Sequence, residues 1–450
     1  MPASWFHNPS FIQRAPIVRA LCLAAAPFCL AFMPMLTEST SAQPPKFVPN
    51  YDEAKVPKYE LPAMWKSAPP ADPKAAAEAW HVRRIELLDM LTHQMFGTMP
   101  NKQAKLEWKT IEQGTAFDGS VKRKQIRVTL STEAGSLPID LLVYTPASAN
   151  GPVTTFLGLN FQGNHTTTPD TAVIIPSSWV PDNKNGTTDK NKALEAGRNA
   201  QGHRMPVEMI TKAGFGIATA YYGDIDPDFD DEFKNGIHAL FPEHKPDEAH
   251  PDSWGSIAAW AWALSRLLDV LQVQPEIDAK SVIVFGHSRL GKTSLWAGAT
   301  DTRFAGVISN DSGCGGAALS RRAYGETVWR INNSFPHWFC RNYRQYNNNE
   351  GAAPFDQHQL LALAAPRLLH VASASEDQWA DPRGEFLSTL EAGHVYEALG
   401  LPGLGLREFP EPGVSSIGWV SYHYRVGKHD LNEWDWQQYV KSAALLKKAN

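Results

Sequence analysis

The chain has 450 residues, of which 43% are hydrophobic and 20% charged, and its formal net charge at pH 7 is −5. Acidic residues outnumber basic ones and no cluster of Lys and Arg occurs, which excludes a nucleic-acid-binding protein held by phosphate contacts. The length is sufficient for a large core, and residues 74–440 contain no internal repeat and no linker rich in Ser, Gly or Pro.

The beginning of the chain has the layout of a secretory signal. Two arginines precede an apolar run over residues 20–36, and small residues follow it at 40–42. The run contains two prolines and is short for a stable membrane span. We therefore expect residues 1–42 to be a signal peptide that is removed after Ala42. The mature protein would be secreted or periplasmic and free of the membrane, and the Pro-rich residues 43–72 would form an extended leader over its surface.

Residues 73–450 alternate between helical and strand patterns. Asp72 and Pro73 predict the cap and first position of a helix that Gly97 closes. The predicted helices are 73–96, 254–271 and 292–299, and the predicted strands are 107–113, 122–131, 138–145, 153–160, 214–221, 281–285, 304–310, 367–372 and 404–409. A polar loop over 165–203 is too long for an ordinary connection and is typical of a functional segment. The alternation predicts a single domain, a three-layer α/β sandwich with a mostly parallel central sheet that binds ligands at the carboxyl ends of its strands.

The segment 282–293, Val-Ile-Val-Phe-Gly-His-Ser-Arg-Leu-Gly-Lys-Thr, fits two chemistries. Read as Gly-x-Ser after a strand, it is a nucleophile elbow that exposes Ser288. Read as Gly-x-x-x-x-Gly-Lys-Thr, it is a phosphate-binding loop with Lys292 and Thr293 in register. An exported protein meets little ATP, and several strands precede a motif that normally opens its domain. Both facts favour the elbow.

A reactive serine needs a base and an acid, which in this type of site follow in the order Ser, Asp or Glu, His. His429 lies in a polar loop before the last helix and is the predicted base. His423 competes with it, but it belongs to an aromatic run and we expect it to be packed. Two carboxylates compete for the acid role. Asp377 follows the strand 367–372, and Asp311 ends the strand that comes after the one carrying the serine.

Arg289 follows the serine directly, so its N–H group could donate to the oxyanion and its guanidinium could add positive charge there. One such preorganised donor is worth about 3–4 kcal/mol of barrier. Aspartates at 224, 226 and 228 occupy the first, third and fifth places of a calcium loop, but Phe229 stands where glycine is needed, which favours a structural loop that rims the pocket. We expect neither a metal nor a cofactor. Cys314 and Cys340 remain after signal removal, and the sequence leaves open whether they form a disulfide or two buried thiols.

Taken together, these motifs resemble those of the glucuronoyl esterases, a carbohydrate esterase family with the α/β-hydrolase fold, in their bacterial form. The resemblance covers roughly residues 70–440 and is carried by separated segments. These are Asn-Phe-Gln-Gly-Asn-His at 160–165, Tyr-Gly-Asp-Ile-Asp-Pro-Asp at 222–228, Trp-Gly-Ser-Ile-Ala-Ala-Trp at 254–260, Gly-His-Ser-Arg-Leu-Gly-Lys at 286–292, Asn-Asp-Ser-Gly-Cys-Gly-Gly at 310–316, Trp-Ala-Asp-Pro at 379–382 and Gly-Lys-His-Asp at 427–430. Gly291 comes three residues after the serine, later than in most elbows, and this is the spacing that the family has.

The resemblance implies a role for each matching residue. It implies Ser288 as nucleophile, His429 as base, Arg289 on the oxyanion side, Lys292 on the hydroxyls of the glucuronate ring, and Trp379 and Glu326 at the sugar. Family members use a carboxylate at either of two positions for the acid, and this chain has both Asp377 and Asp311; we favour Asp377. Fungal members flank the serine and histidine with disulfide-bonded cysteines, whereas His287 and Asp430 stand in those places here.

The implied protein is a secreted serine esterase of the 4-O-methyl-glucuronoyl methylesterase type. It would hydrolyse esters of (4-O-methyl-)glucuronic acid, as in the lignin–carbohydrate esters of glucuronoxylan, through an acyl-enzyme on Ser288, and we expect a monomer. An acetyl-xylan or feruloyl-type esterase on the same fold is the enzymatic alternative. A secreted carbohydrate-binding protein is the non-enzymatic one, but it would not need Ser, Asp and His in chain order.

Overall fold

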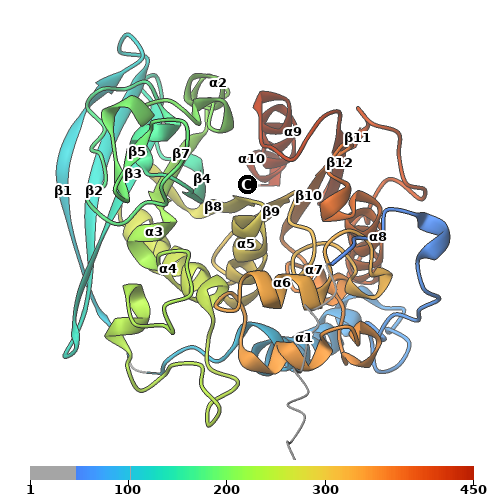
Figure 1. Ribbon diagram of the computed structural model, residues 1–450. Coiled ribbons are helices and arrows are strands. Elements are labelled where there is room, and N and C mark those ends of the chain that lie inside the picture. The colour runs from blue at the N-terminus through green and yellow to red at the C-terminus, as the bar shows by residue number, and fades with distance from the viewer. Residues whose placement is uncertain (1–46, 102, 450) are drawn as a thin grey trace, which may run out of the picture. The chain divides into compact units, whose positions relative to one another are not determined.

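Figure 1 shows the computed structural model of the chain, which describes residues 47–101 and 103–449. The expected signal peptide, residues 1–42, and the first four residues of the expected leader lie outside the described residues. The rest of the leader, 47–72, contains one 3₁₀ turn at Glu53–Lys55 and is otherwise irregular. No helix in the described part of the chain has both the length and the apolar character that a membrane span needs.

A mixed sheet of ten strands runs through the described residues in the order β1–β2–β3–β7–β4–β8–β9–β10–β12–β11. The strands are β1 (Lys105–Ala116), β2 (Val121–Thr132), β3 (Gly135–Pro146), β4 (Val153–Asn160), β7 (Gly216–Tyr221), β8 (Ile277–His287), β9 (Gly306–Asn310), β10 (Leu368–Ala374), β11 (Ser415–Ser416) and β12 (Val420–Arg425). Strands β7, β4, β8, β9, β10 and β12 pair in parallel, while β1–β3 and β11 pair antiparallel at the two ends of the sheet. A separate two-residue hairpin, β5 (Thr188–Asp189) and β6 (Lys192–Ala193), lies within the long polar loop.

Helices cover both faces of this sheet (Figure 1). They are α1 (Pro73–Leu91), α2 (Val207–Lys212), α3 (Tyr222–Ile225), α4 (Ser256–Leu271), α5 (Arg289–Thr300), α6 (Val328–Ser334), α7 (Gln357–Ala362), α8 (Pro382–Ala398), α9 (Glu433–Ala443) and α10 (Leu446–Ala449). Helices α4, α5 and α8 share one apolar core with the sheet, and α2 and α9 share a second core on its other face. The expected three-layer α/β sandwich with a mostly parallel sheet is therefore confirmed.

Strand β8 illustrates why the sequence produces this arrangement. Successive side chains of a strand point to opposite faces of the sheet. Val282 and Val284 accordingly belong to the core under α4 and α5, and Ile283 and Phe285 belong to the core under α9. A continuous apolar run therefore fits a strand that is covered on both sides.

The helix at 73–91 begins as its caps predict, since the Asp72 side chain accepts a hydrogen bond from the Ala75 N–H at 2.9 Å. The predicted strand at 404–409 is wrong, because this segment has no regular secondary structure. Its apolar residues pack on α8 instead, and the rings of Phe409 and Phe386 lie 5.7 Å apart. Glycines and flanking prolines disfavour a ladder there, and β12 takes the place beside β10.

Candidate active site

Ser288 stands at a sharp turn between β8 and α5. Its backbone has φ 58° and ψ −128°, a region that non-glycine residues rarely adopt. The turn is so tight that a Cβ atom on Gly286 would lie 1.8 Å from the carbonyl oxygen of Leu290. The Ser288 N–H donates to the Asn310 carbonyl at the end of β9, at 2.8 Å. The hydroxyl is thereby held at the carboxyl end of the parallel sheet, as a nucleophile elbow requires.

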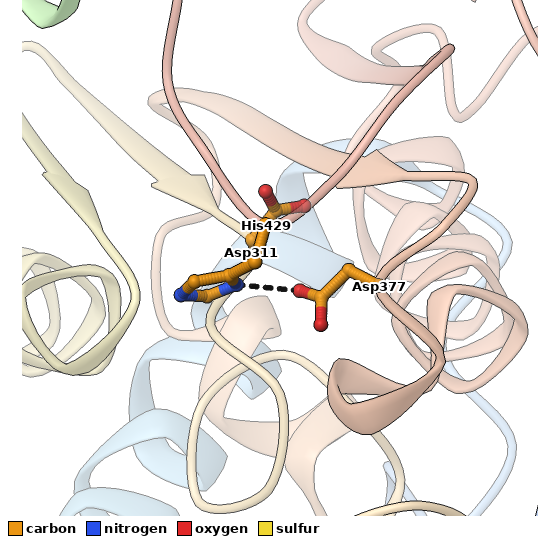
Figure 2. A group of neighbouring side chains, drawn as sticks. All are labelled: Asp311, Asp377 and His429. Atoms are coloured by element: carbon orange, nitrogen blue, oxygen red, sulfur yellow. Dashed lines mark hydrogen bonds and ion pairs between the residues drawn. The ribbon is translucent and has the colours of Figure 1, made fainter.

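His429 lies in the loop between β12 and α9, and Asp377 follows β10. The Nδ1 atom of His429 lies 2.6 Å from Oδ2 of Asp377, as Figure 2 shows. The Asp377 side chain is buried, whereas the imidazole is 41% exposed. A carboxylate at Nδ1 fixes the tautomer with its proton on that nitrogen and leaves Nε2 able to accept a proton. His429 and Ser288 line the same cavity.

Asp311, at the end of β9, is brought close to this pair without joining it. One side-chain oxygen of Asp311, one of Asp377 and one ring nitrogen of His429 all lie within 4.8 Å of one another, and Figure 2 shows the three side chains together. Oδ2 of Asp311 accepts the Asp430 N–H at 3.4 Å, while its Oδ1 has no hydrogen-bond partner among the described residues. Complete burial, and then the charge of Asp377, raise the pKa of Asp311 well above its usual range. Burial thus favours a neutral carboxyl here.

Arg425, which sequence reasoning missed, holds the loop that carries His429. Its Nη2 atom donates to the carbonyls of Lys428 and Asp430, on either side of the histidine, at 2.8 and 2.7 Å. The same guanidinium bonds through Nε to Asp435 of α9 at 2.9 Å. These hydrogen bonds and this ion pair hold the loop in place. No local sequence motif around residue 425 indicates such a role.

The Arg289 guanidinium forms an ion pair with Asp228 and lies over the Trp338 ring, 4.8 Å from its centroid. Asp228 also accepts hydrogen bonds from His337 Nε2 at 2.8 Å and Trp338 Nε1 at 2.7 Å. Burial by itself would raise the pKa of Asp228, but these bonds and the charge of Arg289 bring it to about 2. The loop that resembled a calcium site therefore supplies a partner for the arginine. The 222–228 segment was the only sequence signal of this role.

The other predicted residues line one cavity of about 350 Å³ together with the serine and the histidine. The lining residues are Ser288, Arg289, Lys292, Asp311, Ser312, Gly313, Glu326, Phe335, Trp338, Asp377, Trp379, Ala380 and His429. Lys292 is buried and donates through Nζ to the carbonyl of Ser312. Burial lowers the pKa of Lys292 and raises that of Glu326, while the attraction between the two charges opposes both shifts. The cavity therefore presents an ammonium, a guanidinium, a carboxyl group and aromatic walls beside the serine.

His423, His287 and the two cysteines whose state the sequence left open are all buried. His423 is buried in β12, where its Nε2 lies 2.9 Å from Oδ1 of Asp435, so it cannot act at the cavity. His287 is buried beside the catalytic candidates, with its ring centroid 4.5 Å from that of His429. Cys314 and Cys340 are both buried free thiols.

Comparisons with known proteins place these features in context. A family model described as "Glucuronyl esterase, fungi" matches residues 248–400. The chain is 46% identical over 404 residues to a carbohydrate esterase designated MZ0003 from an unknown prokaryotic organism, a match that covers 89% of this chain and 92% of that protein. A 4-O-methyl-glucuronoyl methylesterase from Phanerochaete carnosa is 28% identical over 297 residues, which cover 63% of this chain and 68% of that protein.

Comparison with solved structures points to the same family of esterases. A promiscuous CE15 esterase from a marine bacterial metagenome has 46% identity and a TM-score of 0.81, with 88% of this chain and 99% of that chain covered. A glucuronoyl esterase from Solibacter usitatus has 42% identity and a TM-score of 0.79, with 87% and 99% covered. The catalytic domain of a glucuronoyl esterase from Hypocrea jecorina has 18% identity and a TM-score of 0.57, with 91% and 92% covered, and supports the fold alone.

Proposed function

The chain belongs to the glucuronoyl esterase family of carboxylic ester hydrolases, as a bacterial-type member, and from this premise we propose that it is an exported serine esterase acting through an acyl-enzyme on Ser288. The observation that carries the proposal is that one cavity of about 350 Å³ is lined by Ser288, His429 and Asp377 and also by Lys292 and Glu326. A nucleophile with its base and acid thus lies within reach of polar groups suited to a sugar acid.

In the first step, Nε2 of His429 takes the proton of the Ser288 hydroxyl while Oγ attacks the carbonyl carbon of the ester. The Asp377 carboxylate stabilises the imidazolium that forms. The carbonyl oxygen becomes an oxyanion, which the Arg289 N–H and guanidinium stabilise. Because the ester is uncharged before attack, this positive charge favours the transition state over the bound substrate.

In the second step, the tetrahedral intermediate collapses and the alcohol leaves with the proton from His429, so the uronic acid remains esterified to Ser288. Water then enters, gives a proton to His429 and attacks the acyl carbon, and the serine departs with that proton. Each proton that the histidine takes is returned, so the enzyme is regenerated without a further reactant.

We propose that the acyl group is a (4-O-methyl-)glucuronic acid ring. Lys292 would donate hydrogen bonds to ring hydroxyls, Glu326 would accept them, and Trp379 would cover one side of the ring. The natural substrate would be the ester that joins glucuronoxylan side chains to lignin alcohols. The leaving alcohol would then extend away from this ring-binding side of the cavity.

A panel of benzyl glucuronate, methyl glucuronate, acetylated xylan and feruloyl esters tests the proposal. We expect the highest kcat/KM on the glucuronates and a loss of at least about 10³-fold in kcat for Ser288→Ala, whose binding of glucuronic acid should persist. Preference for the acetyl or feruloyl esters would establish the alternative esterases. A wild-type protein that binds glucuronic acid but hydrolyses none of the esters would be the carbohydrate-binding alternative.

Export is a separate part of the proposal and rests on residues 1–42. N-terminal sequencing of protein collected outside the cytoplasm should begin at Gln43. Cell-associated protein with an intact N-terminus would contradict it. We also propose that the mature chain acts as a monomer, which analytical ultracentrifugation would check.

A further inference from the structure

Part of the N-terminal leader, residues 47–53, is bonded to the segment 322–325 near the cavity. These hydrogen bonds are, with the donor first, Gly325 N to Asn50 O at 2.8 Å, Tyr324 Oη to Tyr51 O at 3.1 Å, and Arg322 Nη2 to Glu53 Oε1 at 2.5 Å. Backbone and side-chain groups of the leader both take part. The leader is therefore held in one place over this segment.

The segment 322–325 leads directly into the sugar-binding side of the cavity. Glu326 follows it, and the Glu326 N–H donates to the carbonyl of Trp379 at 3.0 Å. Gly325 packs so closely on the same residue that a Cβ atom there would lie 2.4 Å from the Trp379 carbonyl oxygen. Glu326 and Trp379 line the cavity, and Gly325 packs against Trp379. The leader is therefore bonded to the backbone that supports this wall of the cavity.

Phe47 touches the wall itself. Its ring centroid lies 6.0 Å from that of Trp379, in an edge-on arrangement with an interplanar angle of 84°. The same ring stacks on Trp329 of α6 at 5.8 Å, and the guanidinium of Arg330 lies 5.6 Å from its centroid. Trp379 is thus in contact with Phe47 while it lines the cavity. The phenyl ring restricts the positions that the indole can adopt.

We infer that Phe47 is a positioning residue that holds the Trp379 indole where it contacts the uronic-acid ring. The leader is then part of the substrate-binding site and determines affinity for the ring. This inference rests on the proposed function, because it assigns the indole to the sugar. Phe47 does not line the cavity beside Ser288, so its removal affects binding of the substrate and not the chemical step.

Kinetics of Phe47→Ala on benzyl glucuronate test the inference. We expect KM to rise about three- to tenfold, the range that one aromatic pair contributes, while kcat stays within about twofold because ground-state and transition-state binding are lost equally. Phe47→Tyr keeps the ring and should restore the wild-type KM. Val48→Ala is the matched control, since Val48 belongs to the same segment and is 80% exposed. Thermal melting of each variant checks that it is folded.

A double-mutant cycle shows whether Phe47 acts through the tryptophan. We expect Trp379→Ala to raise KM, and Phe47→Ala to raise it no further in that background. An undiminished effect of Phe47→Ala in the Trp379→Ala background would overturn the inference. So would an effect no larger than that of Val48→Ala, or a fall in kcat at constant KM. If Trp379→Ala leaves KM unchanged while Ser288→Ala is inactive, the assignment of the indole to the sugar is wrong, and the inference fails with it.

Discussion

Replacing Asp377 with asparagine should remove most of the activity, whereas the same change at Asp311 should not. The Nδ1 atom of His429 lies 2.6 Å from an Asp377 oxygen, so this carboxylate faces the imidazolium that forms during both steps. With the charge centres about 4 Å apart and an effective dielectric constant of about 20, their attraction is about 4 kcal/mol. That energy corresponds to about three powers of ten in rate.

Two further effects bracket the magnitude. An amide in place of the acid also allows the wrong histidine tautomer, and the equivalent change in a well-studied Ser-His-Asp protease lowers kcat about 10⁴-fold. Exposure of the His429 side chain, 41%, lets solvent screen part of the attraction. We therefore expect Asp377→Asn to lower kcat about 10³- to 10⁴-fold with little change in KM.

Asp311→Asn is the matched comparison. Burial raises the pKa of Asp311 well above its usual range and so disfavours the charged carboxylate, which is the form that asparagine cannot reproduce. Asparagine also tolerates the positive φ of 44° at this position. We expect a loss of less than about tenfold in kcat, because the residue makes no hydrogen bond to the histidine and its burial disfavours the charge that the substitution removes.

Steady-state kinetics on benzyl glucuronate decide the matter, with thermal melting to show that both variants are folded. Losses of similar size in the two variants would refute the reasoning. Equal and mild losses would mean that the two carboxyl groups share the role. A severe loss from Asp311→Asn alone would make Asp311 the working acid, despite the hydrogen bond that His429 donates to Asp377.

Three other predictions concern the cavity, the pH dependence of stability and the thiols. Lys292→Met should raise KM for benzyl glucuronate about ten- to a hundredfold, because hydrogen bonds from a buried ammonium are lost, and unchanged KM would contradict its role at the sugar. Asp228, with its pKa of about 2 against a usual 3.8, contributes about 2 kcal/mol of stability above pH 4 that is lost as the pH falls toward 2. In urea unfolding, the free energy of unfolding of the wild type should therefore fall by about 2 kcal/mol more than that of Asp228→Asn over that interval. Equal falls in the two proteins would disprove the pairing. Cys314 and Cys340 are buried, and burial raises the pKa of both thiols, that of Cys340 to about 12. In a chain that begins at Gln43, Ellman's reagent should detect two thiols after unfolding and none in the folded protein, whereas none in either state would mean a disulfide.

Features set by near neighbours could be predicted from the sequence. The turn at Ser288 depends on Gly286, whose missing side chain makes room within five residues. Asp72 caps a helix through a bond to Ala75, three residues away. The apolar run of β8 indicates a strand covered on both faces, whatever covers it. Each of these follows from local sterics or hydrogen bonding, which adjacent residues decide.

Features that depend on residues distant in the chain required the tertiary structure. Asp311 and Asp377 follow β9 and β10, neighbouring parallel strands whose residues Asn310 and Ala372 are in register. Both carboxyl groups therefore reach the same end of the sheet, and only the path of the loop after β12 decides which one meets His429. The strand predicted at 404–409 does not form, and the segment that pairs with β10 is 420–425, which comes later in the chain.

The sequence by itself determined the sharp turn at Ser288, the class of fold and most of the groups that gather at the carboxyl ends of the strands, though not Arg425. Only the folded chain decided which charges pair, as between Arg289 and Asp228, and which rings touch, as between Phe47 and Trp379. The backbone geometry of a turn or a helix cap is determined by a few neighbouring residues. The approach of two side chains that are far apart in sequence depends on every element packed between them.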